Sequence, residues 1–365
     1  MEQRRRQRIE SLKNKILSEP RYASIEQAKI ITDSYRQHPN QSRVLQRAFA
    51  LKAALEQIHI RVEPGELIVG NRTAGVRYGV VFPESGSSWV DQEFETLPTR
   101  PQDQFQVKKE DILYFREEIK PFWEGKSLED VLKKTYGKEI NEISKIVKIN
   151  QKDHAQGHIC PDCRRWLQKG PKGLWEEAKE KRKTAFGQQK EFYESIMLVM
   201  EGTIHFMLRY ALKIRSLKEN QIEGQKKKME LIAKNCENLA KRPAVSFHEA
   251  LQSLWFLFVI LHMESNASSF SPGRLDLILE PYYKRDLEKE TLTSSQALEL
   301  IECLWLKFNE IVYMRNANSA KYFAGFPIGF NIAIGGQDRE GNNVENDLSY
   351  LFLKAQEELD RKSVV

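Results

Sequence analysis

The feature that most constrains the fold is an almost unbroken apolar run, 251–263, that changes abruptly into small and polar residues at 264–269. A segment that is apolar on every side is stable only when it is buried, so the run predicts a core helix. The residues after it, 265–283, add hydroxyl and amide groups, a Ser-Pro-Gly turn signal and a Pro-Tyr-Tyr corner. Polar groups at the end of a rigid buried element are a common basis for a binding site. The alternative is a core helix followed by an ordinary serine-rich turn.

The composition is that of a soluble globular chain, without a signal for nucleic acid or membrane. The 365 residues are enough for one large domain or two ordinary ones. The net charge of +6 is a small excess of 57 basic over 51 acidic residues, and the basic clusters 4–6 and 226–228 fall in helical patterns, which indicates solvated helix faces. The longest apolar run is too short to span a membrane, and the first residues lack a secretory apolar segment. Four cysteines in a chain of this length favour free thiols in a reducing cytoplasm.

The hydrophobic periodicity predicts one continuous, helix-rich α/β domain without repeats. Two helix starts carry capping signals, Ser42 and the Ser-x-x-Glu box that begins at Ser246. Short strands are expected at 67–71 and 330–336. Helices are expected at 8–17, 24–35, 42–59, 108–122, 127–136, 174–217, 225–241, 246–263, 293–310 and 346–359.

The pair Cys160 and Cys163 has the spacing of a redox motif. A thioredoxin-like site would place the first cysteine at a helix start after a strand, and here the preceding residues are polar while the following ones are helical. A zinc site would need a second pair, yet Cys236 and Cys303 lie far away in helical patterns and are expected to be small core residues. Redox function, metal binding and a purely structural role therefore stay open for this motif.

His154 and His158 are four residues apart, which on a helix would place both rings on one face as ligands or as a proton relay. Gly157 and Pro161 disfavour a regular helix there, and no third metal ligand is evident, so no metal site is predicted. The alternative is that both histidines face solvent or are structural. No glycine-rich phosphate loop, nucleophile elbow or kinase signature occurs, which leaves a polar site near Ser268 and Ser269.

Further motifs follow one another along nearly the whole chain, in addition to the stretch 264–283. They are Glu66-Leu-Ile-Val-Gly-Asn-Arg72, Phe82-Pro-Glu84, Leu97-Pro-Thr-Arg100, Pro121-Phe-Trp-Glu-Gly-Lys126, Gly157-His158, Lys169-Gly-Pro-Lys-Gly173, His248-Glu-Ala-Leu-Gln-Ser-Leu-Trp-Phe256, Gly335-Gly-Gln-Asp338 and Asn346-Asp-Leu-Ser-Tyr350. Each is weak alone, but in this order they are specific. The chain resembles the glycyl radical enzymes, the pyruvate formate-lyase-like family, in its dehydratase, lyase and decarboxylase branches.

The resemblance implies the first half of a ten-stranded α/β barrel wrapped by helices, in which two five-stranded parallel halves are set antiparallel. Residues 1–60 would form a helical part, and residues 61–365 the half-barrel with its surrounding helices. In the family, one loop carries a cysteine that becomes a thiyl radical and another carries a glycine that stores the radical. A separate radical SAM activating enzyme installs it. The barrel must exclude water and oxygen while it orients the substrate.

The sequence departs from the family in lacking both loops. No cysteine lies in a Gly-Cys-x-Glu setting, and no Arg-Val-x-Gly-Tyr glycine loop is present. The family chain is considerably longer, so this chain looks like an N-terminal portion with no catalytic residue and no bound cofactor of its own. The glycyl radical would reside on the C-terminal part.

The resemblance gives a substrate-binding role to His158 and, by proximity, to His154. It also gives one to Ser268 and Ser269, because relatives place polar substrate contacts there. Glycerol dehydratases have His-Ser at that pair, so Ser268 in place of the histidine argues against glycerol or diol dehydration. Phe326 falls where relatives have an aromatic pocket wall. A few polar groups in an apolar cavity suit a small-molecule site.

The resemblance implies a lyase or dehydratase that cleaves a C–O, C–N, C–S or C–C bond of a small polar substrate. Its partners would be the activating enzyme and a second copy of the chain in a homodimer. One alternative is an arylacetate-type decarboxylase. A second, from another class, is a truncated non-catalytic chain or a partner subunit.

Overall fold

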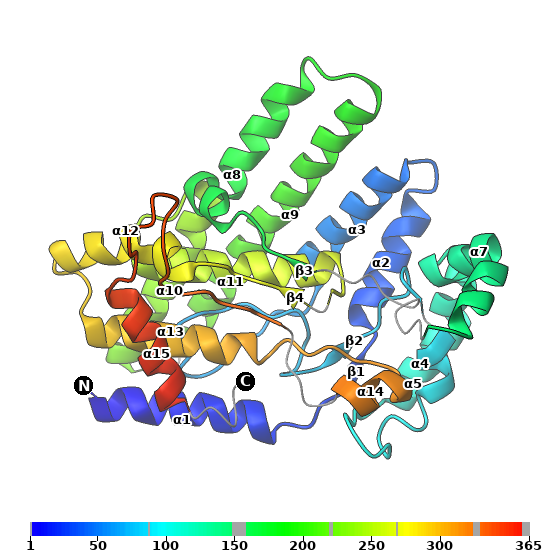
Figure 1. The fold of residues 1–365 in the computed structure, drawn as a ribbon, viewed down its shortest axis with the longest axis horizontal. Helices are drawn as coiled ribbons and strands as arrows, with labels where there is room; N and C mark the ends of the chain where they lie inside the picture. The colour runs from blue at the N-terminus through cyan, green and yellow to red at the C-terminus, as the bar shows by residue number, and fades with distance from the viewer. Residues whose placement is uncertain are drawn as a thin grey trace.

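The computed structural model describes residues 2–86, 88–147, 158–218, 222–267, 269–323 and 329–359, and the side chains of all of these except 322 and 323. Helices dominate the architecture, and the few strands are short (Figure 1). The predicted helix-rich α/β class is confirmed. The elements in chain order are α1 (Glu2–Ser18), β1 (Ala23–Ser24), α2 (Glu26–Gln37), α3 (Arg43–Gln57), β2 (Gly79–Val80), α4 (Ser88–Glu93), α5 (Lys109–Tyr114), the π-helix η1 (Phe115–Ile119), α6 (Lys120–Trp123), α7 (Leu128–Ser144), β3 (His158–Ile159), α8 (Cys163–Arg182), α9 (Gly187–Lys218), α10 (Glu223–Lys241), α11 (Phe247–Glu264), β4 (Ser269–Phe270), α12 (Leu275–Glu288), α13 (Ser294–Phe308), α14 (Ala317–Phe323) and α15 (Asp347–Glu358).

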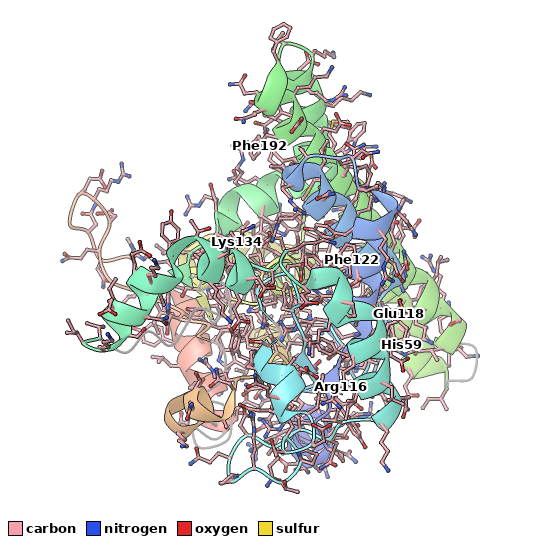
Figure 2. The ribbon with its side chains drawn as sticks, turned by 90° about the vertical axis from the view of Figure 1, so that its right-hand side faces the viewer. His59, Arg116, Glu118, Phe122, Lys134 and Phe192 are labelled. Carbon is pink, nitrogen blue, oxygen red and sulfur yellow. The ribbon has the colours of Figure 1, made fainter. Side chains whose placement is uncertain are left out.

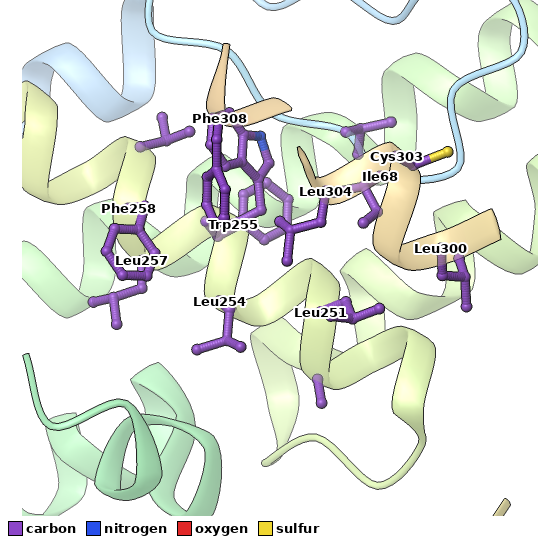
Figure 3. Close-up of a cluster of buried hydrophobic side chains, with 14 of the residues drawn as sticks. Ile68, Leu251, Leu254, Trp255, Leu257, Phe258, Leu300, Cys303, Leu304 and Phe308 are labelled. Atoms are coloured by element: carbon purple, nitrogen blue, oxygen red, sulfur yellow. The ribbon is translucent and has the colours of Figure 1, made fainter. Parts of the chain in front are cut away.

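Helix α11 is the buried centre of the molecule, as the apolar run predicts. Nearly all of its side chains are buried, including the largest, Trp255 and Phe258. Its apolar residues pack against α13, where Leu304 and Phe308 face it (Figure 3). The chain is partly exposed at the end of α11, at Glu264 and Ser265, and becomes buried again at Asn266 and Ala267.

The predicted helix starts are confirmed at their caps. Ser42 accepts from the backbone N–H of Leu45 at 3.4 Å, and Ser246 accepts from that of Glu249 at 3.2 Å. The second half of the expected box at Ser246 does not form, because the Glu249 carboxylate accepts instead from the backbone of Val245 and pairs with Arg242. The Glu249 carboxylate thus forms charge-assisted bonds both with Arg242 and with the backbone one residue before the N-cap.

The strand predicted at 67–71 is wrong. The segment is mostly buried, but its backbone forms no strand pairing, and side chains satisfy its polar groups, among them Gln252 on α11. The Val69 N–H donates to Gln252 Oε1 at 2.9 Å, and Gln252 Nε2 donates to the Val69 carbonyl at 2.6 Å. A glutamine amide offers one donor and one acceptor, so it can satisfy a peptide group as a strand would.

The strands of the described residues form parallel pairs. β1 pairs with β2, and β3 pairs with β4. The strand predicted at 330–336 is reduced to a single parallel bridge between Ile332 and Gly273. The segments 158–160, 269–273 and 329–333 therefore lie side by side in that order, with the β4 segment in the middle.

A second, smaller core lies beside the first and is built by α2, α4 and η1 with the segments between them. On its outer side Arg116 donates to Asp91 at 2.7 Å and ties η1 to α4. Figure 2 shows Arg116, Glu118 and Phe122 along this outer run of helix. Helix α7 packs less closely, since it has no buried residue. None of the described helices is both long and apolar enough to cross a membrane.

Candidate substrate site at the end of α11

The structure brings two of the predicted site residues together. His158 on β3 and Ser269 on β4 are directly paired in register, and Figure 1 shows both strands beside the end of α11. His158 is exposed, whereas the Ser269 side chain is 4% exposed and lies inside the sheet. The other three predicted residues, His154, Ser268 and Phe326, lie outside the described residues.

The Ser269 hydroxyl already has a partner for its proton. Its Oγ donates to the carbonyl of Gly329 at 2.8 Å, which joins β4 to the third segment of the sheet. A hydroxyl that donates its only proton keeps two lone pairs with which to accept. Ser269 can therefore accept a hydrogen bond from a ligand O–H or N–H while it holds this geometry.

The turn after β4 needs glycine at Gly273. Its φ of +75° lies in the left-handed region, and a Cβ placed there would lie 2.9 Å from the sulfur of Cys160. The backbone of Gly273 also accepts from the N–H of Ala333 at 2.9 Å. The Ser-Pro-Gly signal in the sequence thus marks the point where the three segments of the site approach most closely.

Arg274 and Asp276, which follow this turn, do not pair with each other. Both hold the segment 335–337: Arg274 donates to the Gly335 and Gln337 carbonyls, and Asp276 accepts from the Gly335 N–H at 2.6 Å. Asp276 also accepts from the Ser349 hydroxyl at the start of α15. These contacts fix the third segment of the site to α12 and α15.

Two buried groups behind β4 were not singled out from the sequence. The Arg72 guanidinium donates to the carbonyls of His262 and Val312 and to the side chain of Asn266, at 2.6–3.2 Å. It thereby holds the C-terminal end of α11. The motif Glu66–Arg72 contained this arginine, but only the folded chain shows that its partners come from three separate segments.

The ring of His262 is neutral at physiological pH. Burial, followed by the nearby Arg72 cation, lowers the pKa of His262 to about 3. Its Nδ1 donates to the Phe258 carbonyl, and its ring packs edge-on against Phe270 at 4.7 Å between centroids. Burial likewise lowers the pKa of Arg72 to about 10, so the arginine stays charged. The wall behind β4 is therefore apolar except for one fixed positive charge.

The cysteine pair lies at the entrance to α8. Cys160 is exposed, and Cys163 is the buried first residue of the helix. Burial raises the pKa of the Cys163 thiol to about 12, so it is protonated and a poor nucleophile at neutral pH. Cys236 and Cys303 are buried in helices, which confirms their prediction as core residues.

Among the described residues, no group of three or more His, Cys, Asp or Glu side chains could hold a metal ion.

The short parallel segments follow a buried helix in the chain and are covered by further helices. This arrangement corresponds to part of an α/β barrel with a polar site at the ends of its strands. The chain belongs to the pyruvate formate lyase-like family, whose model matches residues 1–363. Its relatives are glycyl radical dehydratases and lyases, and the predicted family is confirmed.

Three similar proteins show the extent of the match. The probable dehydratase YbiW of Escherichia coli is 32% identical over 90% of this chain, and the isethionate sulfite-lyase of Oleidesulfovibrio alaskensis is 31% identical over 92%. The glycerol-bound B12-independent glycerol dehydratase from Clostridium butyricum superposes with a TM-score of 0.92 at 33% identity over 97% of this chain. The chain spans less than half of each, namely 42%, 43% and 46% of their lengths.

Proposed function

We propose that this chain is the N-terminal portion of a glycyl radical lyase or dehydratase and supplies one wall of its substrate pocket. The observation that supports this most is the pairing of His158 with Ser269 at the end of α11. The strands that carry these two polar side chains also carry Phe270, whose ring packs edge-on against the buried ring of His262. Such a combination orients a small polar molecule and keeps water out.

The bonding of Ser269 favours a substrate that carries a hydroxyl group. Because its proton is committed to the Gly329 carbonyl, Ser269 can accept from a substrate O–H but cannot donate to a carboxylate in this geometry. The group common to all arylacetates is a carboxylate, to which Ser269 cannot donate in this geometry, so a decarboxylase is the weaker alternative. A non-catalytic partner subunit would not need the enclosed polar site.

The radical chemistry itself would come from elsewhere in the protein. This sequence has no Gly-Cys-x-Glu loop and no glycine loop, and its buried thiols Cys163, Cys236 and Cys303 have pKa values raised by burial. The chain's own residues bind, orient and exclude solvent. We infer that the complete protein is a cytoplasmic homodimer and that a radical SAM activating enzyme installs its glycyl radical. Residues 1–60 would form a helical part, and residues 61–365 the half-barrel with its surrounding helices.

The test uses the complete polypeptide, activated anaerobically, with Ser269→Ala. We expect kcat/KM for the physiological substrate to fall by about tenfold, because one neutral hydrogen bond is lost, while the glycyl radical signal keeps its intensity. Ser269→Thr keeps the hydroxyl and should restore most of the activity.

The control is Ser271→Ala, which alters a neighbouring hydroxyl outside β4. An equal loss of radical signal and turnover in Ser269→Ala would show a structural role for this serine and contradict the proposal. So would full activity of that variant with a hydroxylated substrate.

A further inference from the structure

A cavity of about 210 Å³ lies between α9, α10 and the turn 62–67, and shares no residue with the site at β3 and β4. Its walls are mostly apolar, and its mouth is polar. The apolar lining residues are Val62, Leu67, Val69, Ile214, Leu217, Met229 and Ile232. A dry cavity of about 150 Å³ takes up a molecule the size of benzene, so this space accommodates a somewhat larger apolar body.

The walls of this cavity are fixed by buried and half-buried ion pairs. On one side Glu66 pairs with Lys307 and also accepts from the backbone N–H of Glu63 at 2.9 Å, which pins the turn 62–67. On the other side, Arg215 and Lys218 of α9 pair with Glu230 of α10 at 3.3 and 2.6 Å. A cavity with such walls is formed before a ligand arrives, and preorganisation of this kind favours binding.

The charged lining residues of this cavity are two cations, Arg8 and Lys228, and two carboxylates, Glu63 and Glu66. Arg8 is paired with Glu299, whereas no carboxylate of the described residues lies within ion-pair distance of the Lys228 ammonium. Partial desolvation, followed by the Arg8 cation, lowers the pKa of Lys228 against the opposing effect of the Glu299 carboxylate, so a further anion would stabilise its charged form. The carboxylate of Glu63 at the same mouth is already held by Lys15 and Arg61.

We propose that this cavity is a second ligand site, which binds a small amphipathic anion with its apolar body between α9 and α10 and its anionic group at Lys228. The chemical class is a medium-chain or aryl-alkyl carboxylate. The apolar walls exclude a sugar or a nucleotide, and the single unpaired cation selects one negative group over a neutral or positive one.

The test is calorimetric titration of the complete polypeptide with octanoate, and with octan-1-ol and octylammonium, which have the same alkyl chain but no charge or the opposite charge. We expect one octanoate per chain, bound about fivefold more tightly than octan-1-ol, since the difference is one exposed ion pair. Leu217→Trp fills the cavity and should abolish binding. Met229→Trp is a second filling variant, and circular dichroism identifies which of the two is folded.

Lys228→Gln should weaken octanoate about fivefold, to the affinity of octan-1-ol, and leave octan-1-ol unchanged. Lys227→Gln is the matched control, because Lys227 is an exposed neighbour on α10 that does not line the cavity. Absence of octanoate binding would overturn the proposal. So would unchanged binding in a folded filling variant, equal affinity for octylammonium, or equal weakening by the two lysine substitutions.

Discussion

Arg72 shows how one residue can hold the end of the central helix. Its guanidinium is buried, its hydrogen bonds go to uncharged oxygens, and no carboxylate of the described residues pairs with it. A buried charge without a counterion is costly, and here three well-placed acceptors compensate it. Those acceptors belong to α11, to Asn266 two residues beyond its end, and to the segment after α13, so the arginine holds the chain shortly before β4.

Arg72→Lys should lower the free energy of unfolding by about 2 kcal/mol, because a lysine keeps the charge but cannot span three acceptors. Urea denaturation measures this change. The matched control is Arg36→Lys, an exposed arginine at the surface of α2, which should change stability by less than about 0.5 kcal/mol. Equal effects of the two substitutions would contradict the role given to Arg72.

Glu84 is a half-buried residue whose shielded carboxylate has a measurable consequence. Burial raises its pKa to about 7, and its Oε2 has no hydrogen-bond partner. The folded protein therefore binds a proton that the unfolded chain has released between about pH 4.5 and 7. Stability must fall as the pH rises through that window, because the folded state then binds more protons than the unfolded state.

Glu84→Gln removes this ionisation, so we expect the variant to be more stable than the parent by about 2 kcal/mol at pH 8 and equally stable at pH 4.5. Unfolding by urea at several pH values tests the slope. Glu124→Gln, at an exposed position, should leave the pH dependence of the parent unchanged. A parallel displacement of both curves at all pH values would contradict the assignment.

At the scale of elements, α12 anchors the site through its first turn. The buried carboxylate of Asp276 accepts from the backbone of Gly335 and Leu277 and from the hydroxyl of Ser349. Three segments distant in sequence thus meet at one side chain. Arg274 and Asp276 are two residues apart and opposite in charge, yet each has backbone partners in 335–337 instead of the other.

Asp276→Ala should cost about 3 kcal/mol of stability, because it leaves buried donors unpaired. Amide hydrogen exchange should rise in 331–337 and at the start of α15, and stay unchanged in α9. Ser349→Ala removes only one of the three bonds and should cost about 1 kcal/mol. Unchanged exchange in 331–337 would show that Asp276 does not hold this segment.

Helices were more predictable than strands, for a physical reason. The periodicity and caps of α3, α11 and α13 depend on residues close in sequence, so the chain itself carries the signal. The segment 67–71 is apolar like a strand, but its partner is Gln252, a side chain far away in sequence. The pairing of His158 with Ser269 is equally non-local. Periodicity could not show either contact, and the family resemblance only indicated the region of the second.

At the scale of the whole molecule, the arrangement is consistent with the proposed substrate site, which has no reactive group of its own. Strand β4 follows helix α11 in the chain. Arg72 holds the end of α11 before β4, and Asp276 holds the start of α12 after it. Strand β3 and the segment 329–333 lie on either side of β4. The resemblance also predicts what must complement it, a part of the protein that carries the radical cysteine and glycine. The chain spans less than half the length of its relatives, which agrees with that division of roles.

The most direct test of this account is electron paramagnetic resonance of the complete protein after anaerobic activation by its radical SAM partner. We predict a glycyl doublet that oxygen destroys, and no such signal from residues 1–365 treated in the same way. A complete, folded and activated protein without the doublet would contradict the account, as would a glycyl doublet from residues 1–365 alone.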